Sequence, residues 1–196
     1  MKQRLLLIAI ASFFVLASCK QEIEQENATG SEMFKSLPSS YTGIDFKNTI
    51  TETEENNHLV WESIYNGAGV GVGDINGDGL SDIYMCGNMT DDKLYLNRGK
   101  MQFEDITIKA NIKENTWSSG VTMADVNNDG LLDIYVCKMS WHKDKEKADL
   151  RKNKLYINMG SNYFEEKAEE YGVADAGHST QASFFDSTRM ACSIYM

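Results

Sequence analysis

The sequence predicts an all-β protein, and two observations lead to this prediction. A nine-residue acidic segment occurs twice, 51 positions apart, as DINGDGLSD at 74–82 and DVNNDGLLD at 125–133. Each copy runs directly into a short stretch of β-branched and aromatic residues, DIYMC or DIYVC, which is typical of a β-strand. The chain is therefore built from a repeated β unit.

The repeat extends well beyond the acidic segments. KLYLNRG at 93–99 returns as KLYINMG at 154–160, and FED at 103–105 returns as FEE at 164–166, both 61 positions later. The extra residues of the second unit fall within 140–152, a charged stretch that we expect to be a loop. Four short strands per unit are typical of the blades of a β-propeller. We predict strands at 68–73, 82–86, 93–97 and 102–107, then at 119–124, 132–137, 154–158 and 162–166, with little helix beyond a turn near 167–171.

The acidic segments have the donor pattern of a calcium loop. Oxygen-bearing side chains stand at positions 1, 3, 5 and 9 around a glycine at position 6, and calcium takes six to eight oxygen ligands at about 2.3–2.6 Å. The backbone carbonyl at position 7 would add a further ligand. The alternative is an Asp/Asn/Gly turn without an ion. The predicted ligands are Asp74, Asn76, Asp78, Leu80 and Asp82 in the first loop, and Asp125, Asn127, Asp129, Leu131 and Asp133 in the second.

The loops are not EF-hands. An EF-hand needs a bidentate Glu at position 12 and a following helix, whereas position 12 here is Met85 or Val136 within a predicted strand. The ninth residue of each segment, Asp82 or Asp133, is therefore expected where the loop becomes a strand.

These segments resemble a known family. Gly69–Tyr84 and Gly120–Tyr135 are similar to the FG-GAP or VCBS repeats of integrin α-chain propellers and of large bacterial surface lipoproteins. The resemblance covers about residues 37–186, although the literal Phe-Gly and Gly-Ala-Pro triplets are absent. It implies a β-propeller whose loops bind calcium through the side chains named above.

The N-terminus has the pattern of a lipoprotein signal. Lys2 and Arg4 precede an apolar run at 5–15, and LASC at 16–19 resembles a bacterial lipobox. The run is too short for a transmembrane helix, which needs about 20 residues. We expect cleavage before Cys19 and a lipid on its thiol; the alternative is a plain signal peptide with an incidental cysteine. Residues 20–36 are polar and acidic and predict a tether. Lys20 followed by Glu22, Glu24 and Glu26 loosely resembles the surface-export signals of Bacteroidetes lipoproteins, which favours the outer membrane and leaves the periplasmic or surface face open.

Bulk properties exclude some functions and leave others open. A formal net charge of −10 argues against a nucleic-acid partner, because phosphate backbones require clustered Lys and Arg. We find no Ser-His-Asp or Cys-His arrangement and predict no enzymatic activity.

Cys86 and Cys137, at equivalent positions, are interpreted as buried strand thiols. The tryptophans Trp61, Trp117 and Trp141 are expected to pack between blades, with a sugar-binding face as the alternative.

A third unit begins and then loses its pattern. Residues 178–186 parallel 117–125, and Asp186 stands where a third acidic loop should start, but STRMACSIYM at 187–196 lacks the motif. With permitted codon choices, restoring one T after the Asp186 codon gives DFDKDGLFDIY, a complete third loop. A single-base deletion in the gene or in its sequencing is therefore our hypothesis, with chance resemblance as the alternative.

Together these observations predict a modular envelope protein. We expect a signal peptide at 1–18, a tether at 19–36, a lead-in and first blade at 37–112, a second blade at 113–174, and the start of a third at 175–196. The expected function is that of a calcium-binding, lipid-anchored binding or adhesion scaffold for a protein or glycan ligand, forming part of a larger protein. The alternative is a non-catalytic fragment of a carbohydrate-processing or other enzyme.

Overall fold

The computed structural model describes residues 34–112, 116–139, 149–186 and 192–195. Contacts within the chain divide it into two units, Met1–Ser36 and Leu37–Met196, and the strands described below belong to the second. The predicted signal peptide and Cys19 lie outside the described residues. Within the described residues, no helix has the length and apolar character needed to cross a membrane.

The first repeat forms a four-stranded antiparallel sheet, here called blade 1. Its strands are β1 (Val70–Gly73), β2 (Asp82–Met85), β3 (Lys93–Asn97) and β4 (Phe103–Asp105), hydrogen-bonded in chain order. Val70 pairs with Met85 and Gly73 with Asp82, so the acidic segment closes the β1–β2 connection.

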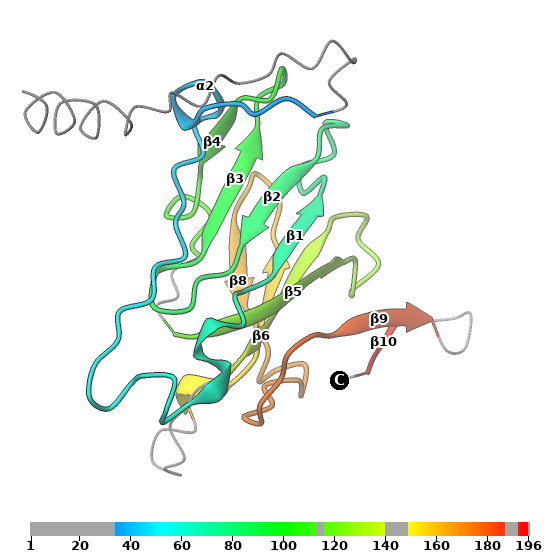
Figure 1. Cartoon of the computed structure of the whole chain (residues 1–196). Coiled ribbons are helices and arrows are strands. Elements are labelled where there is room, and N and C mark those ends of the chain that lie inside the picture. Colours follow the sequence, from blue (N-terminus) through cyan, green and yellow to red (C-terminus); the bar gives the residue numbers. More distant parts are fainter. Residues whose placement is uncertain (1–33, 113–115, 140–148, 187–191, 196) are drawn as a thin grey trace, which may run out of the picture. The chain divides into compact units, whose positions relative to one another are not determined.

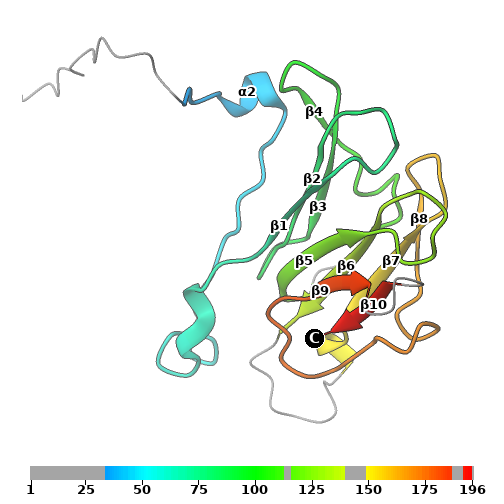
Figure 2. The same cartoon turned by 90° about the vertical axis from the view of Figure 1, so that its right-hand side faces the viewer.

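The second repeat forms an equivalent sheet, blade 2, which lies beside blade 1 (Figures 1 and 2). Its strands are β5 (Ser118–Ala124), β6 (Asp133–Lys138), β7 (Lys154–Asn158) and β8 (Phe164–Glu166). The predicted strands of both units are confirmed, and their ends differ from prediction by no more than two residues. Two adjacent four-stranded antiparallel sheets are the arrangement of a partial β-propeller.

Helical structure is sparse, as predicted. The helix α2 (Ser39–Thr42) and the 3₁₀ helix η1 (Glu62–Tyr65) are each four residues long. The expected turn near 167–171 is present, where the Tyr171 N–H donates to the Lys167 carbonyl (3.0 Å).

The third unit begins as a two-stranded hairpin. Strand β9 (Ser183–Asp186) pairs antiparallel with β10 (Cys192–Tyr195). The innermost strands of the three units pack side by side, because β1 contacts β5 and β5 contacts β9. This order places blade 2 between two neighbours.

Glycines allow the innermost strands to approach closely. A Cβ added at Gly69 would lie 2.8 Å from the Gly120 Cα, and one added at Gly71 would lie 3.2 Å from a Val121 methyl group. Side chains of the two blades therefore form one core where β1 meets β5. In this core, Tyr84, Leu94 and Leu96 of blade 1 pack with Val121, Ile134 and Val136 of blade 2. A second core lies between blade 2 and the third unit and includes Tyr135, Cys137 and Ala182.

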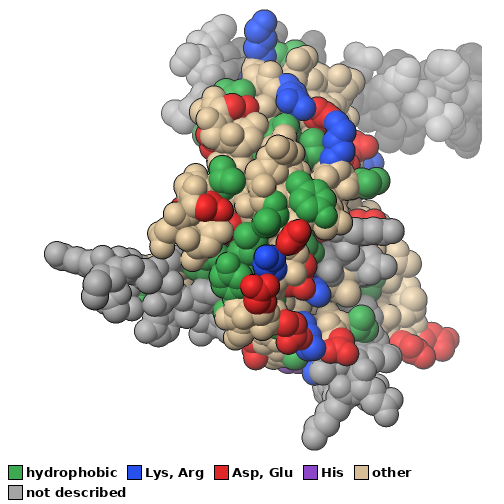
Figure 3. Space-filling model, turned by 180° about the vertical axis from the view of Figure 1, so that it is seen from behind, with side chains coloured by type: hydrophobic (Ala, Val, Ile, Leu, Met, Phe, Trp, Pro, Cys, Tyr) green, Lys and Arg blue, Asp and Glu red, His purple; other side chains and the backbone are tan. Residues whose placement is uncertain are grey.

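The outer surface carries both signs of charge. Seen from behind, hydrophobic side chains gather near the middle of the face, with acidic and basic side chains interspersed around them (Figure 3). On blade 1, Lys93 pairs with Asp105, and Glu104 pairs with both Arg98 and Lys109. Surface ion pairs of this kind contribute little stability, about 0–1 kcal/mol each.

Candidate metal centre

The first acidic loop is organised by the carboxylate of Asp74, the residue that follows β1. Its Oδ1 accepts the N–H groups of Gly77 (2.8 Å) and Asp78 (3.2 Å), and its Oδ2 accepts that of Gly79 (2.8 Å). These backbone hydrogen bonds, above all that of Gly79, lower the pKa of Asp74. Gly77 and Gly79 have φ of 74° and 83°, the left-handed conformation that lets the chain wrap around the carboxylate.

The middle of the loop is held by Asn76 and Asp78. The Asn76 amide Nδ2 donates to Asp78 Oδ2 (3.0 Å), and the Asp78 N–H donates back to Asn76 Oδ1 (3.0 Å). Asp78 Oδ1 accepts the N–H of Leu80 (2.8 Å). Both side chains are therefore fixed by atoms within five residues of one another.

The last carboxylate of the loop, Asp82, is buried and is the first residue of β2, as the sequence predicts. Its Oδ2 accepts the N–H of Ile75 (3.0 Å), and its Oδ1 accepts the N–H of Asn97 on β3 (2.7 Å). Burial raises the pKa of Asp82, because its charged form has lost contact with water. Asp82 thus joins the acidic loop to two strands of the blade.

The second loop repeats this geometry. Asp125 accepts the N–H groups of Asp129 (3.1 Å) and Gly130 (2.9 Å), Asn127 donates to Asp129 (2.9 Å), and Asp129 accepts the N–H of Leu131 (2.8 Å). Buried Asp133 begins β6 and accepts the N–H groups of Val126 (2.9 Å) and Asn158 (2.8 Å). Burial raises the pKa of Asp133 as it does that of Asp82.

The residue types of both loops fit calcium, but their side chains are not drawn together around one point. Each loop offers three carboxylates and one amide oxygen. Asp74 Oδ1 accepts two hydrogen bonds, but the other carboxylate oxygens named above accept one each and keep a second lone pair for a cation. The side chains are held by N–H groups of the loops and flanking strands. Within the described residues, no group of three or more His, Cys, Asp or Glu side chains lies in an arrangement that could hold a metal ion. Leu80 and Leu131 occupy the positions where a carbonyl ligand was predicted.

Two residues that support the loops were not predicted from the sequence. Asn97 ends β3 and Asn158 ends β7, and each donates its backbone N–H to the ninth carboxylate of its own blade. Their side-chain amides also donate to loop carbonyls, Asn97 to Ser81 (2.9 Å) and Asn158 to Leu132 (3.1 Å). The sequence signal was the Asn that ends both KLYLN and KLYIN.

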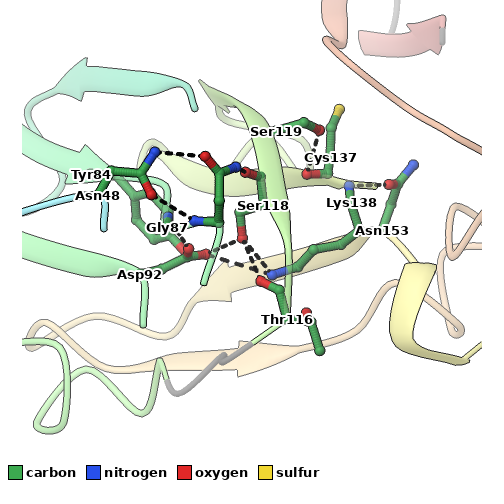
Figure 4. A network of polar contacts seen from close by, with 11 residues as sticks. Asn48, Tyr84, Gly87, Asp92, Thr116, Ser118, Ser119, Cys137, Lys138 and Asn153 are labelled. Carbon is green, nitrogen blue, oxygen red and sulfur yellow. Dashed lines mark hydrogen bonds and ion pairs between the residues drawn. The ribbon is translucent and has the colours of Figure 1, made fainter. Parts of the chain in front are cut away.

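A buried polar network connects the two blades at a separate position (Figure 4). Asp92 Oδ2 accepts the hydroxyls of Tyr84 (2.8 Å) and Ser118 (2.7 Å) and lies 3.6 Å from Lys138 Nζ, while Asp92 Oδ1 accepts the Gly87 N–H (2.6 Å). Lys138 Nζ also donates to Ser118 Oγ (2.7 Å), and both charged side chains are fully buried. Burial raises the pKa of Asp92, and Lys138 opposes that shift. The network has the residues of a Ser-Lys pair, but complete burial makes it a structural connection between blades.

The remaining candidate residues have packing roles. Cys86 and Cys137 are free, buried thiols, as predicted. Trp117 is buried, and its ring meets that of Trp61 edge to face at 4.4 Å, while Trp141 lies outside the described residues. A pocket of about 290 Å³ adjoins this pair where the inner strands begin, and its lining includes Ser63, Asn66, Trp117, Ser119 and Thr180.

Comparison with known proteins found a match to one family model. Residues 55–136 match the model of an FG-GAP-like repeat. The match spans blade 1, β5, the second acidic loop and β6 as far as Val136, and therefore includes both candidate metal loops. A comparison with curated proteins gave no match.

Proposed function

We propose that this chain, whose residues 55–136 match an FG-GAP-like repeat, is a β-propeller-type binding scaffold whose two acidic loops bind calcium. The observation that carries the proposal is the duplication of a complete loop geometry. In both loops, the carboxylates at positions 1, 5 and 9 accept equivalent backbone N–H groups. A turn without an ion needs only some of these carboxylates.

Calcium would act as a structural ion. Each loop connects the innermost strand of a blade to the next strand, so an ion held by Asp74 and Asp82, or by Asp125 and Asp133, would bridge the two strand ends. An ion that binds only the folded state stabilises it by RT ln(1 + [L]/Kd), about 2.7 kcal/mol at a hundredfold excess over Kd. We propose a non-catalytic role for the ion, because the loop carboxylates would be its ligands and would not be available as general bases.

The test compares Asp78→Ala and Asp129→Ala with the unmodified chain. Calorimetry should give about two calcium ions for the unmodified chain and about one for each variant. Each variant should lose about 2.7 kcal/mol more stability in hundredfold excess calcium than in chelator. Asp91→Ala, which removes an exposed carboxylate outside the loops, controls for the change in net charge. If Asp78→Ala and Asp129→Ala cost the same in calcium as in chelator, the loops are ordinary turns.

We also propose that a lipid on Cys19 anchors the chain to the cell envelope. The proposal rests on the basic residues, apolar run and LASC pattern of residues 2–19. Radiolabelled fatty acid should enter the unmodified chain and the Cys192→Ala variant but not Cys19→Ala. Label in Cys19→Ala, together with unchanged partitioning into detergent, would contradict the proposal.

The ligand of the scaffold is proposed to be a protein or a glycan. The pocket beside Trp117 supports a binding role, because it combines an aromatic side chain with the hydroxyls of Ser63, Ser119 and Thr180. A glycan array probed with the unmodified chain and with Thr180→Val tests the glycan alternative. Equal signals from both chains would exclude this pocket as the glycan site.

A further inference from the structure

The side chain of Asn158 contacts both candidate calcium loops. Its amide Nδ2 donates to the Leu132 carbonyl of the second loop (3.1 Å) and to the Ile75 carbonyl of the first loop (2.8 Å), 83 residues away in the chain. Asn158 is only 2 % exposed and Ile75 only 1 %. A buried hydrogen bond of this kind is protected from competition with water, so the two loops are held in a fixed relation.

Three hydrogen bonds connect the two ninth carboxylates through this residue. Asp133 Oδ1 accepts the Asn158 N–H (2.8 Å), and the Asn158 side chain donates to the Ile75 carbonyl (2.8 Å). The Ile75 N–H in turn donates to Asp82 Oδ2 (3.0 Å). Each end of this path is a predicted calcium ligand, and the residues between them are buried.

Asn97 provides a natural comparison within the same chain. It occupies the equivalent position in blade 1, and it makes the same contacts to its own blade, to the Asp82 carboxylate (2.7 Å) and the Ser81 carbonyl (2.9 Å). Within the described residues, no acidic loop precedes blade 1, so Asn97 has no neighbouring loop to bridge. The bond to Ile75 is therefore the feature that separates the two asparagines.

We propose that the two calcium sites are positively coupled, and that Asn158 is the positioning residue that couples them. The inference rests on the proposed function. An ion on Asp133 would fix the carboxylate that orients Asn158, and Asn158 would then fix the Ile75 peptide that orients Asp82. The second ion would bind a loop that the first ion has already ordered. Its binding would lose less conformational entropy, which raises its affinity. By linkage, the effect is the same in both directions.

Calorimetry on the full chain measures this coupling. The affinity of each loop alone comes from Asp78→Ala, which leaves the second loop, and from Asp129→Ala, which leaves the first. In the unmodified chain, the second ion should bind about fivefold or more tightly than to the corresponding single loop, the lower end of typical coupling between sites. This ratio should fall to about one in Asn158→Ala and persist in Asn97→Ala. Both variants lose a bond to their own loop, but only Asn158→Ala loses the bond to Ile75.

The outcomes separate this inference from the function on which it rests. If the unmodified chain binds no calcium, the proposed function fails and the coupling fails with it. If it binds two ions with a ratio of one, or if Asn97→Ala lowers the ratio as far as Asn158→Ala does, only the coupling is overturned.

A second measurement needs no change at Asn158. In Asp78→Ala, calcium fills only the second loop, and it should slow hydrogen exchange of the Ile75 amide, which bonds to Asp82. The exchange of that amide should not respond to calcium in the Asp78→Ala, Asp129→Ala double variant. A rate for Ile75 in Asp78→Ala that is the same with calcium and with chelator would overturn the proposed coupling.

Discussion

Blade 1 and blade 2 each connect to the next unit through a buried acceptor side chain, which is charged in blade 1 and neutral in blade 2. In blade 1 the Gly87 N–H donates to the Asp92 carboxylate (2.6 Å), and in blade 2 the Lys138 N–H donates to the Asn153 amide oxygen (2.7 Å). Each acceptor also bonds to an equivalent serine of the next unit, Asp92 to Ser118, which begins β5, and Asn153 to Ser179, which precedes β9. The neutral acceptor, Asn153, needs no counter-ion. The charged form needs the Lys138 cation, which the neighbouring blade supplies.

The blades also differ in what covers them. Every residue of β6 is buried, whereas β2 alternates between buried and half-buried residues. Val121 of β5 is 5 % exposed, but its equivalent on β1, Val70, is 58 % exposed. Blade 2 lies between two neighbours and blade 1 has one described neighbour, so equivalent strands of the two blades bury unequal areas. In a repeat protein, stability depends on the interfaces between units as much as on the units.

The largest expected effect comes from removing the buried charge. Asp92→Ala should lower the free energy of unfolding by about 3–5 kcal/mol, because it removes the carboxylate that lies beside the buried Lys138 cation. Asn153→Ala removes the neutral hydrogen bonds to the Lys138 N–H and to Ser179, and should lower the free energy of unfolding by about 1–3 kcal/mol. Urea unfolding of both variants measures the difference. Combining Asp92→Asn with Lys138→Met should recover part of the loss, and equal costs for Asp92→Ala and Asn153→Ala would contradict the distinction.

A smaller difference is expected between the equivalent valines. Val121→Ala should cost about 2 kcal/mol, from roughly 0.8 kcal/mol for each buried carbon removed and a further cost for the cavity. Val70→Ala should stay within about 0.5 kcal/mol, as for other surface positions. Thermal and urea unfolding measure both. A cost for Val70→Ala as large as that for Val121→Ala would mean that the face of β1 is covered in solution.

The two acidic loops allow a finer comparison at their fourth position. Gly77 has φ of 74° and its equivalent, Asn128, has φ of 59°, so the same left-handed conformation is met by two residue types. Gly77→Ala should lower the free energy of unfolding by about 1 kcal/mol, because the left-handed conformation strains an L-residue. No atom lies within 4 Å of the added Cβ, so no steric clash adds to this cost. Gly77→Asn should cost less than about 0.5 kcal/mol, because Asn tolerates this conformation. Stability in chelator distinguishes them, and a larger cost for Asn would refute the equivalence of the loops.

The equivalent cysteines predict a gradual loss of stability at alkaline pH. Burial raises the pKa of Cys137 from 9.0 to about 11 and raises that of Cys86 as well, where the Asp92 charge adds to the effect. The unfolded chain therefore loses these protons first, and stability present below pH 9 should fall as pH rises toward 11. Cys86→Ala and Cys137→Ala should each make the fall in melting temperature over this range shallower. An unchanged slope in both variants would show that the thiols do not contribute.

Much of the site follows from local sequence. The contacts of Asp74, Asn76 and Asp78 span two to five residues, so these hydrogen bonds depend on the local Asp/Asn/Gly pattern. The strand that begins at Asp82 was predicted from its β-branched and aromatic residues. Asn97 was present in the repeat, but its role was missed because its partners lie 15 and 16 residues earlier in the chain.

The sequence by itself determined the repeat, its strands and the conformation of the acidic loops, since these depend on backbone preferences and hydrogen bonds over a few residues. Only the tertiary structure decided which blade supplies Lys138 to Asp92, and which loop carbonyl Asn158 reaches. It also decided that Val70 is exposed while Val121 is buried. The physical reason is that these contacts form between blades, where burial and distance depend on how whole sheets pack and not on the residues next to them in the chain.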